Sequence, residues 1–89
     1  MMDATDDDLA QAMYRAKIWL RMNGDYDIKI DLWGPYGLTY VQGFYLGNVI
    51  AESKGRTVGK HLHRVLESMM VYRKDKASRD AEAYQNAKA

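Results

Sequence analysis

Residues 25–45 read DYDIKIDLWGPYGLTYVQGFY, and the apolar side chains at the start of this stretch recur every second residue. They alternate with charged neighbours, as expected for a strand with one buried face: Tyr26, Ile28, Ile30 and Leu32. The turn sequence GPYG follows at 34–37. An aromatic and β-branched run over 38–45 then predicts a second strand. A connection this short predicts antiparallel pairing.

Helical patterns flank this hairpin on both sides. Before it, Thr5 is a candidate N-cap, Asn23-Gly24 provides a stop, and the spacing of apolar residues predicts a helix over 6–22. After it, a tight connection at 46–48 leads to a short third strand over 49–53. Thr57 then caps a second helix, which extends over about 57–85. The strands of the hairpin are expected at about 25–33 and 38–45.

The predicted fold class is therefore α+β, with one three-stranded antiparallel sheet flanked by two helices in the order α-β-β-β-α. All 89 residues fit a single domain, 1–89. The second helix carries a stripe of apolar residues on its inward face. Tyr72 is the last of them, because Lys76 occupies the next position of the stripe one turn later. The C-terminal part of the helix is therefore expected to project past the sheet. A second, offset stripe could join two copies of the chain as a homodimer. Its members are Leu66, Met70, Ala77, Ala81 and Tyr84.

Composition excludes several classes of protein. Cysteine is absent, which rules out disulfides, thiolate zinc sites and cysteine nucleophiles and suits a reducing cytoplasm. The N-terminal residues are acidic where a signal peptide would be basic, and no apolar run is long enough to span a membrane. We therefore expect a cytoplasmic protein. The charges that give the net value of +1 are unevenly distributed, because residues 1–31 carry −3 and residues 32–89 carry +4.

Motifs for catalysis or cofactor binding are missing from the sequence. His61 and His63 are two residues apart on a predicted helix and point in different directions, so they are expected to be surface or interface residues rather than ligands of one metal. The sequence contains no phosphate-binding loop, no dinucleotide-binding glycine pattern and no nucleophile elbow. We expect neither an enzyme nor a bound cofactor.

Aromatic residues gather around the predicted hairpin, where five of the ten in the chain fall within 33–45. A sheet covered on one face cannot bury both faces of this hairpin, so some of these rings are expected to stay exposed and to anchor a protein partner. An aromatic-rich core is the structural alternative. The predicted partner-binding residues combine aromatic and acidic side chains: Trp33, Tyr36, Tyr45, Asp25, Asp27 and Asp31.

Nucleic-acid binding is the alternative hypothesis. Four basic residues bracket the start of the second helix, where free backbone N–H groups also favour phosphate. They are Lys54, Arg56, Lys60 and Arg64, with Glu67 on the same helix face as the last two.

The stretch LTYVQGFYLGNVIAESKGRT at 38–57, together with the helix that follows, resembles part of a double-stranded-RNA-binding domain. That family has the same α-β-β-β-α order, and the resemblance implies RNA binding through the start of the second helix. Lys60 is the residue that matches the family's lysine-rich motif there. The family's Gly-Pro-x-His loop corresponds to Gly34-Pro35-Tyr36-Gly37, which lacks the histidine.

The whole chain also resembles, in style, small phage-encoded inhibitors of the anti-CRISPR type. Those of them that are short and cysteine-free often combine a small sheet with a long alanine-rich C-terminal helix, a character shared by RDAEAYQNAKA at 79–89. The resemblance implies a non-enzymatic protein that covers a surface on a larger host protein or nucleoprotein complex. This is our leading expectation for function, ahead of nucleic-acid binding and of self-association through the C-terminal helix.

Overall fold

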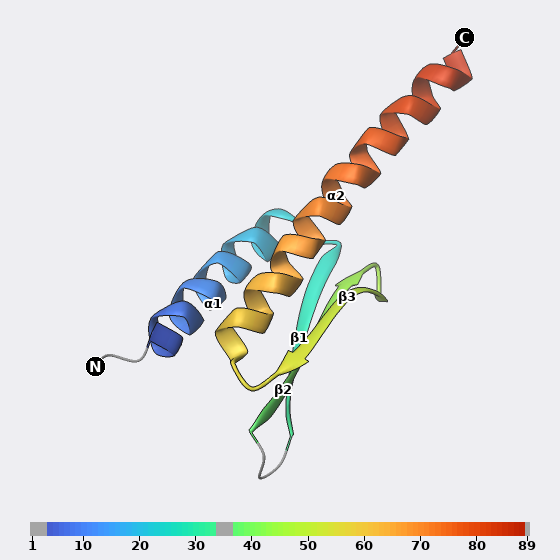
Figure 1. Cartoon of the computed structure of the whole chain (residues 1–89). Helices are drawn as coiled ribbons and strands as arrows, with labels where there is room; N and C mark the ends of the chain where they lie inside the picture. The colour runs from blue at the N-terminus through green and yellow to red at the C-terminus, as the bar shows by residue number, and fades with distance from the viewer. Residues whose placement is uncertain (1–3, 34–36, 89) are drawn as a thin grey trace.

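The structure, a computed structural model, describes residues 4–33 and 37–88, with side chains described over 9–32 and 37–87. The elements are α1 (Ala4–Met22), β1 (Tyr26–Trp33), β2 (Leu38–Tyr45), β3 (Asn48–Gly55) and α2 (Val58–Lys88). The strands form one antiparallel sheet in the order β1-β2-β3, and α1 and α2 lie side by side and run in the same direction (Figure 1). The expected α-β-β-β-α fold class is confirmed.

The third strand is longer than the sequence suggested, and the loop before it explains why the strand begins earlier. Leu46 and Gly47 have positive φ angles of 49° and 82°, the pattern of a two-residue type I′ turn. The twist of such a turn matches that of the strands it joins, so pairing resumes at once between Tyr45 and Asn48. Strand β3 therefore begins at residue 48 rather than 49, and it continues to residue 55 rather than 53.

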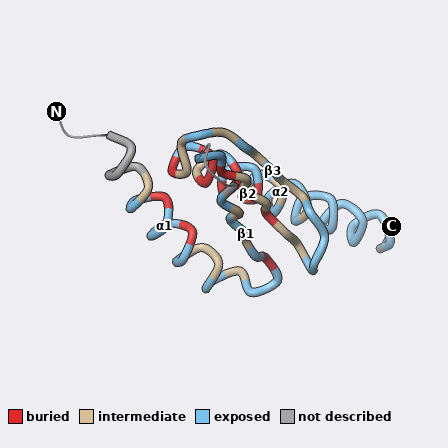
Figure 2. The backbone as a smooth tube through the Cα atoms, turned by 90° about the horizontal axis from the view of Figure 1, so that it is seen from below, coloured by how far each residue is buried: buried red, intermediate tan, exposed pale blue. Residues whose placement is uncertain are grey.

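The core lies between the helices and one face of the sheet. Helix α2 packs across β2 and β3, and α1 packs mainly against α2 rather than against the strands. The inner face of β1 is consequently left partly uncovered, and Leu32 is 73% exposed. Figure 2 shows the buried positions concentrated where the helices and the sheet meet. The buried apolar residues are Ala12, Ala16, Tyr26, Val41, Leu62, Val65, Leu66 and Met69.

Successive residues of β2 point to opposite faces of the sheet. Thr39 and Val41 are fully buried on the face that α2 covers. Gly43 shares that face, and a Cβ atom placed on it would lie 2.5 Å from Met69 Sδ and 2.9 Å from Val65 Cγ1. The missing side chain therefore allows α2 to approach the middle strand closely.

Beyond the sheet, α2 continues as an isolated helix. Every residue over 77–87 is exposed, and the molecule extends 59 Å along its longest axis against 24 and 17 Å along the others (Figures 1 and 2). This confirms the predicted projection of the helix. The offset stripe needs a correction, because Leu66 is fully buried within the core and Met70 is half-buried. Over the described residues, neither helix is long and apolar enough to cross a membrane.

We predict that Gly43→Ala lowers the free energy of unfolding by about 1–3 kcal/mol, because the added methyl group must displace Met69 and Val65 from a packed interface. Gly24→Ala is the matched control, since nothing lies within 4 Å of the position of its added Cβ. Thermal and urea unfolding would measure both variants. Equal stability for the two would contradict the close approach of α2 to β2.

Candidate functional site

The face of the sheet opposite the helices is not covered by any element among the described residues, and we call it the open face. Tyr40, Gln42 and Phe44 of β2 form its centre, and all three are half-buried. The neighbouring strands, β1 and β3, place charged side chains next to these three residues. These are Asp27, Lys29 and Asp31 on β1, and Glu52 and Lys54 on β3.

Hydrogen bonds hold the polar groups at the centre of the open face in place. The Tyr40 hydroxyl donates to Glu52 Oε2, and Gln42 Nε2 donates to the same hydroxyl at 3.4 Å. The bond to Glu52 raises the pKa of Tyr40, with smaller contributions from burial and from the negative charge of Glu52. The Tyr40 side chain is thus held across two strands by contacts within the sheet.

The electrostatic character of the open face is mildly acidic. It carries three carboxylates, Asp27, Asp31 and Glu52, against two ammonium groups, Lys29 and Lys54. The ion pair between Lys29 Nζ and Asp31 Oδ2 spans 3.8 Å and is exposed to solvent, so it contributes little to stability. Carboxylates in excess on this face repel a nucleic-acid backbone, which is itself negatively charged.

The predicted partner-binding residues fall in different places. Asp27 and Asp31 lie on the open face. Trp33 ends β1, but its side chain is outside the described residues, as is the whole of Tyr36. Asp25 lies just before β1, where its carbonyl accepts a hydrogen bond from the Leu46 N–H at 2.9 Å.

Tyr45 lies on the helix side of the sheet, within an aromatic cluster. Its ring centroid is 4.8 Å from that of Tyr26 and 5.6 Å from that of Tyr72. Trp19 of α1 meets Tyr26 edge-on at 4.8 Å, and Lys76 Nζ lies 5.7 Å from the Tyr45 ring centroid. Tyr45 therefore joins the end of the sheet to both helices and is separate from the open face.

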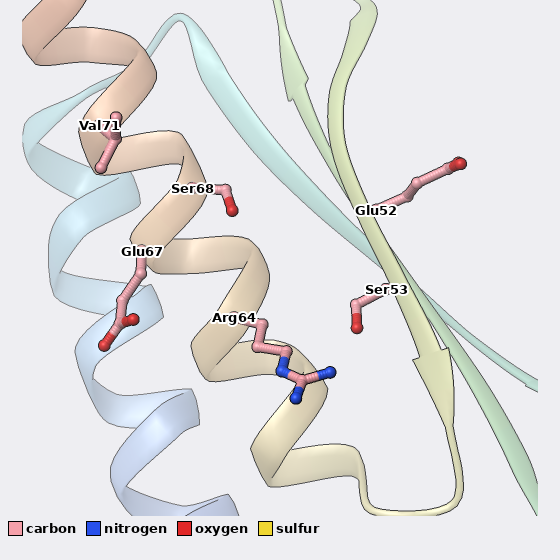
Figure 3. A pocket seen from close by; sticks show the side chains of 6 residues that line it. All are labelled: Glu52, Ser53, Arg64, Glu67, Ser68 and Val71. Carbon is pink, nitrogen blue, oxygen red and sulfur yellow. The ribbon is translucent and has the colours of Figure 1, made fainter.

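The four basic residues of the alternative hypothesis lie on two sides of β3. Lys54 is on the open face, opposite Tyr40. Arg56 and Lys60 are exposed around the start of α2, where the Thr57 carbonyl accepts the His61 N–H at 3.2 Å, as in an N-cap. Arg64 lies on the helix side, in a groove between α2 and β3 (Figure 3). The structure does not bring the four onto one continuous surface.

The two histidines have structural contacts, and for His61 the expectation of a surface or interface position is wrong. His61 is only 8% exposed, because it packs beneath Gly55, and its Nδ1 shares a 2.6 Å hydrogen bond with Ser53 Oγ. His63 is half-buried and its Nδ1 accepts a hydrogen bond from Arg15 of α1 at 3.1 Å. No three potential ligands cluster around a metal position in the part of the chain that the structure describes.

Sequence reasoning missed the central residues of the open face: Tyr40, Gln42, Phe44 and Glu52. The aromatic density was recognised, but the β2 residue chosen was Tyr45, which lies on the helix side of the sheet rather than on the open face. The available signal was Gly43, because a glycine in a strand often marks the face that another element approaches. Gly43 points to the same face as Thr39 and Val41, so the residues between them point to the open face.

Comparison with known proteins adds nothing to this description. No family model matches the chain, and neither a curated protein nor a solved structure matches it significantly.

We predict that stability falls when the pH is lowered from about 7.5 to about 5.5, because burial, followed by the charges of Arg64 and Lys60, lowers the pKa of His61 from its ordinary value of 6.5. The unfolded chain then binds a proton more readily than the folded one. The stabilisation is complete above pH 6.5 and is lost as the pH falls from there through the folded-state pKa.

Thermal unfolding at the two pH values measures this effect. The His61→Gln variant should lose most of the pH dependence, whereas His63→Gln should keep it. A wild-type protein equally stable at both pH values would refute the burial of His61.

Proposed function

We propose that this protein is a non-enzymatic binding protein that uses the open face of its sheet to cover a surface on a larger protein. The observation that carries this proposal is a pair of half-buried aromatic rings, Tyr40 and Phe44, at the centre of a face with no element above it among the described residues. Protein interfaces place aromatic side chains at the centre and polar groups at the rim, and tyrosine is enriched among the residues that dominate binding energy.

The arrangement around Tyr40 supports this function in a second way. Its hydroxyl is already held by Glu52 and Gln42, so binding would cost little additional side-chain entropy. The charged residues on both sides, Asp27 and Asp31 on β1 and Lys54 on β3, supply a rim able to select a partner with complementary charge. The excess of carboxylates favours a basic groove on that partner.

We also propose a narrower identity for the partner, namely a nucleic-acid-handling complex in the cytoplasm of a host cell. The support is the resemblance of the chain to phage-encoded inhibitors of CRISPR-type complexes, together with the acidic residues of the open face. Complexes that handle nucleic acid contain basic grooves, and carboxylates on a rigid sheet would compete with phosphate for such a groove.

The test is affinity capture from a bacterial lysate, followed by measurement of the dissociation constant for the captured partner. We expect Tyr40→Ala to weaken binding by about 30-fold, or about 2 kcal/mol, because truncation removes an aromatic group from the centre of the interface. Tyr14→Ala is the matched control, since Tyr14 is 67% exposed on α1 and should leave the affinity unchanged. Circular dichroism would verify that both variants fold.

Labelled duplexes of RNA and DNA give the decisive counter-test. If the protein binds a duplex with an affinity that falls steeply with salt, and if Lys60→Ala weakens that binding while Tyr40→Ala does not, the proposed function is overturned in favour of nucleic-acid binding. Equal affinity of the wild type and Tyr40→Ala for the captured protein would also overturn it.

A further inference from the structure

Strand β1 forms a free edge of the sheet. The strand order is β1-β2-β3, so the outer side of β1 pairs with no strand among the described residues. Two hydrogen bonds show which main-chain groups point outward. The Asp25 carbonyl accepts the Leu46 N–H at 2.9 Å across the sheet, whereas the Ile28 N–H donates to Asp27 Oδ1 at 2.8 Å. Main-chain groups alternate in direction along a strand, so the even-numbered residues of β1 present their N–H and C=O groups to the free edge.

The same even-numbered residues carry an apolar row on the helix side of the sheet: Ile28, Ile30 and Leu32. Helix α1 packs mainly against α2, so this row loses its cover toward the end of the strand. Ile28 is half-buried, Ile30 is 38% exposed and Leu32 is 73% exposed. Unpaired main-chain groups beside exposed apolar side chains make this edge a template for another strand.

The charges on the other side of β1 make the strand complementary to itself. Lys29 and Asp31 are successive residues on the open face, and their side chains form an exposed ion pair of 3.8 Å. If β1 pairs antiparallel with β1 of a second copy, centred on Ile30, Lys29 of each copy lies opposite Asp31 of the other. On the helix side, Ile30 then lies opposite its own counterpart, and Ile28 lies opposite Leu32. Opposite charges and apolar groups that face each other across two strands stabilise the pairing.

Other registers of the same pairing are less favourable. A slide of two residues in one direction places Lys29 opposite Lys29 and Asp27 opposite Asp31. A slide of two residues in the other direction places Asp31 opposite Asp31. A slide of four residues either places Asp31 opposite Asp25 or carries Lys29 beyond the end of the partner strand. Like charges directly opposite each other destabilise a sheet, so the charge pattern favours the register centred on Ile30.

We propose that two copies of this chain associate through antiparallel pairing of their β1 strands about a two-fold axis at Ile30. The pairing joins two three-stranded sheets into one sheet of six strands. Ile28 of each copy exchanges main-chain hydrogen bonds with Leu32 of the other, and the Ile28 N–H gives up its bond to Asp27. The association does not require the proposed partner protein, because the aromatic centre of the open face lies on β2 and stays uncovered in the dimer.

The other free edge, β3, offers less to a second copy. The residues that β3 turns toward the helices are small, namely Ala51, Ser53 and Gly55. His61 of α2 already lies against the last two. A strand added to β3 would therefore bury little apolar side-chain area. The exposed apolar row selects β1 as the edge, and its charge pattern selects a second copy of the same strand as the occupant.

Charge reversal tests the pairing, with the dissociation constant of the dimer measured by analytical ultracentrifugation. Lys29→Asp and Asp31→Lys each turn two attractive cross-strand pairs into repulsive ones, and each should raise the dissociation constant about tenfold or more. An equimolar mixture of the two variants should form a heterodimer about as tight as the wild-type dimer, because each acidic position of one variant then faces a lysine of the other. Lys17→Asp, the reversal of an exposed lysine on α1, is the matched control and should leave the dimer unchanged.

Single cysteines test the register, because the chain has no cysteine of its own. Ile30→Cys places two thiols opposite each other, with Cα atoms about 5.5 Å apart, a separation that a disulfide spans, so mild oxidation should cross-link the dimer. Leu32→Cys should not cross-link, because its thiols lie about 13 Å apart along the strands. Circular dichroism would verify that all variants fold.

Four results would each overturn the proposal. They are a wild type that stays monomeric at the highest concentration tested, a dimer that neither charge reversal weakens, a mixture of the two reversed variants without heterodimer, and equal cross-linking of the two cysteine variants. All these measurements use the protein alone, so their outcome is separate from that of the affinity capture.

Discussion

The close contact between α2 and the sheet is the constraint on which the rest of the structure depends. It is possible only because β2 and β3 each present a glycine to the helix, with Gly43 against Met69 and Gly55 against His61. This contact assigns one face of the sheet to the core and leaves the other in solvent. It also places α1 beyond α2, so that α1 buries Ala12 and Ala16 against the second helix and leaves the inner face of β1 partly uncovered.

The proposed binding surface follows from this arrangement. A three-stranded sheet with helices on one side has an open face, and here that face holds Tyr40 and Phe44 among charged side chains. The small residues of β3 that permit the helix contact, Ser53 and Gly55, lie against His61 of α2. The same packing thus produces a flat surface on which Tyr40 is already held by Glu52 and Gln42.

The sequence was sufficient to predict the element order, since the period-two alternation of β1 and the helical stripes are purely local signals. Two aspects were not local. The alternation of β2 alone does not say which of Tyr40 and Tyr45 faces the helix, because both are aromatic and the answer depends on where Met69 and Val65 approach. The burial of His61 likewise depends on Ser53 and Gly55, which lie on a different element. The four basic residues are close together in the sequence, yet Lys54 and Arg64 lie on opposite sides of β3.

The division of the sheet into a covered and an open face can be tested directly, because the chain contains no cysteine of its own. Single cysteines at Val41 and Gln42 are adjacent in sequence but belong to opposite faces, and their rates of reaction with a thiol reagent report exposure in the folded protein. We predict that Val41→Cys reacts at least about 100-fold more slowly than Gln42→Cys, because labelling of the buried position must await local opening. Equal rates, or faster reaction at Val41, would contradict the account.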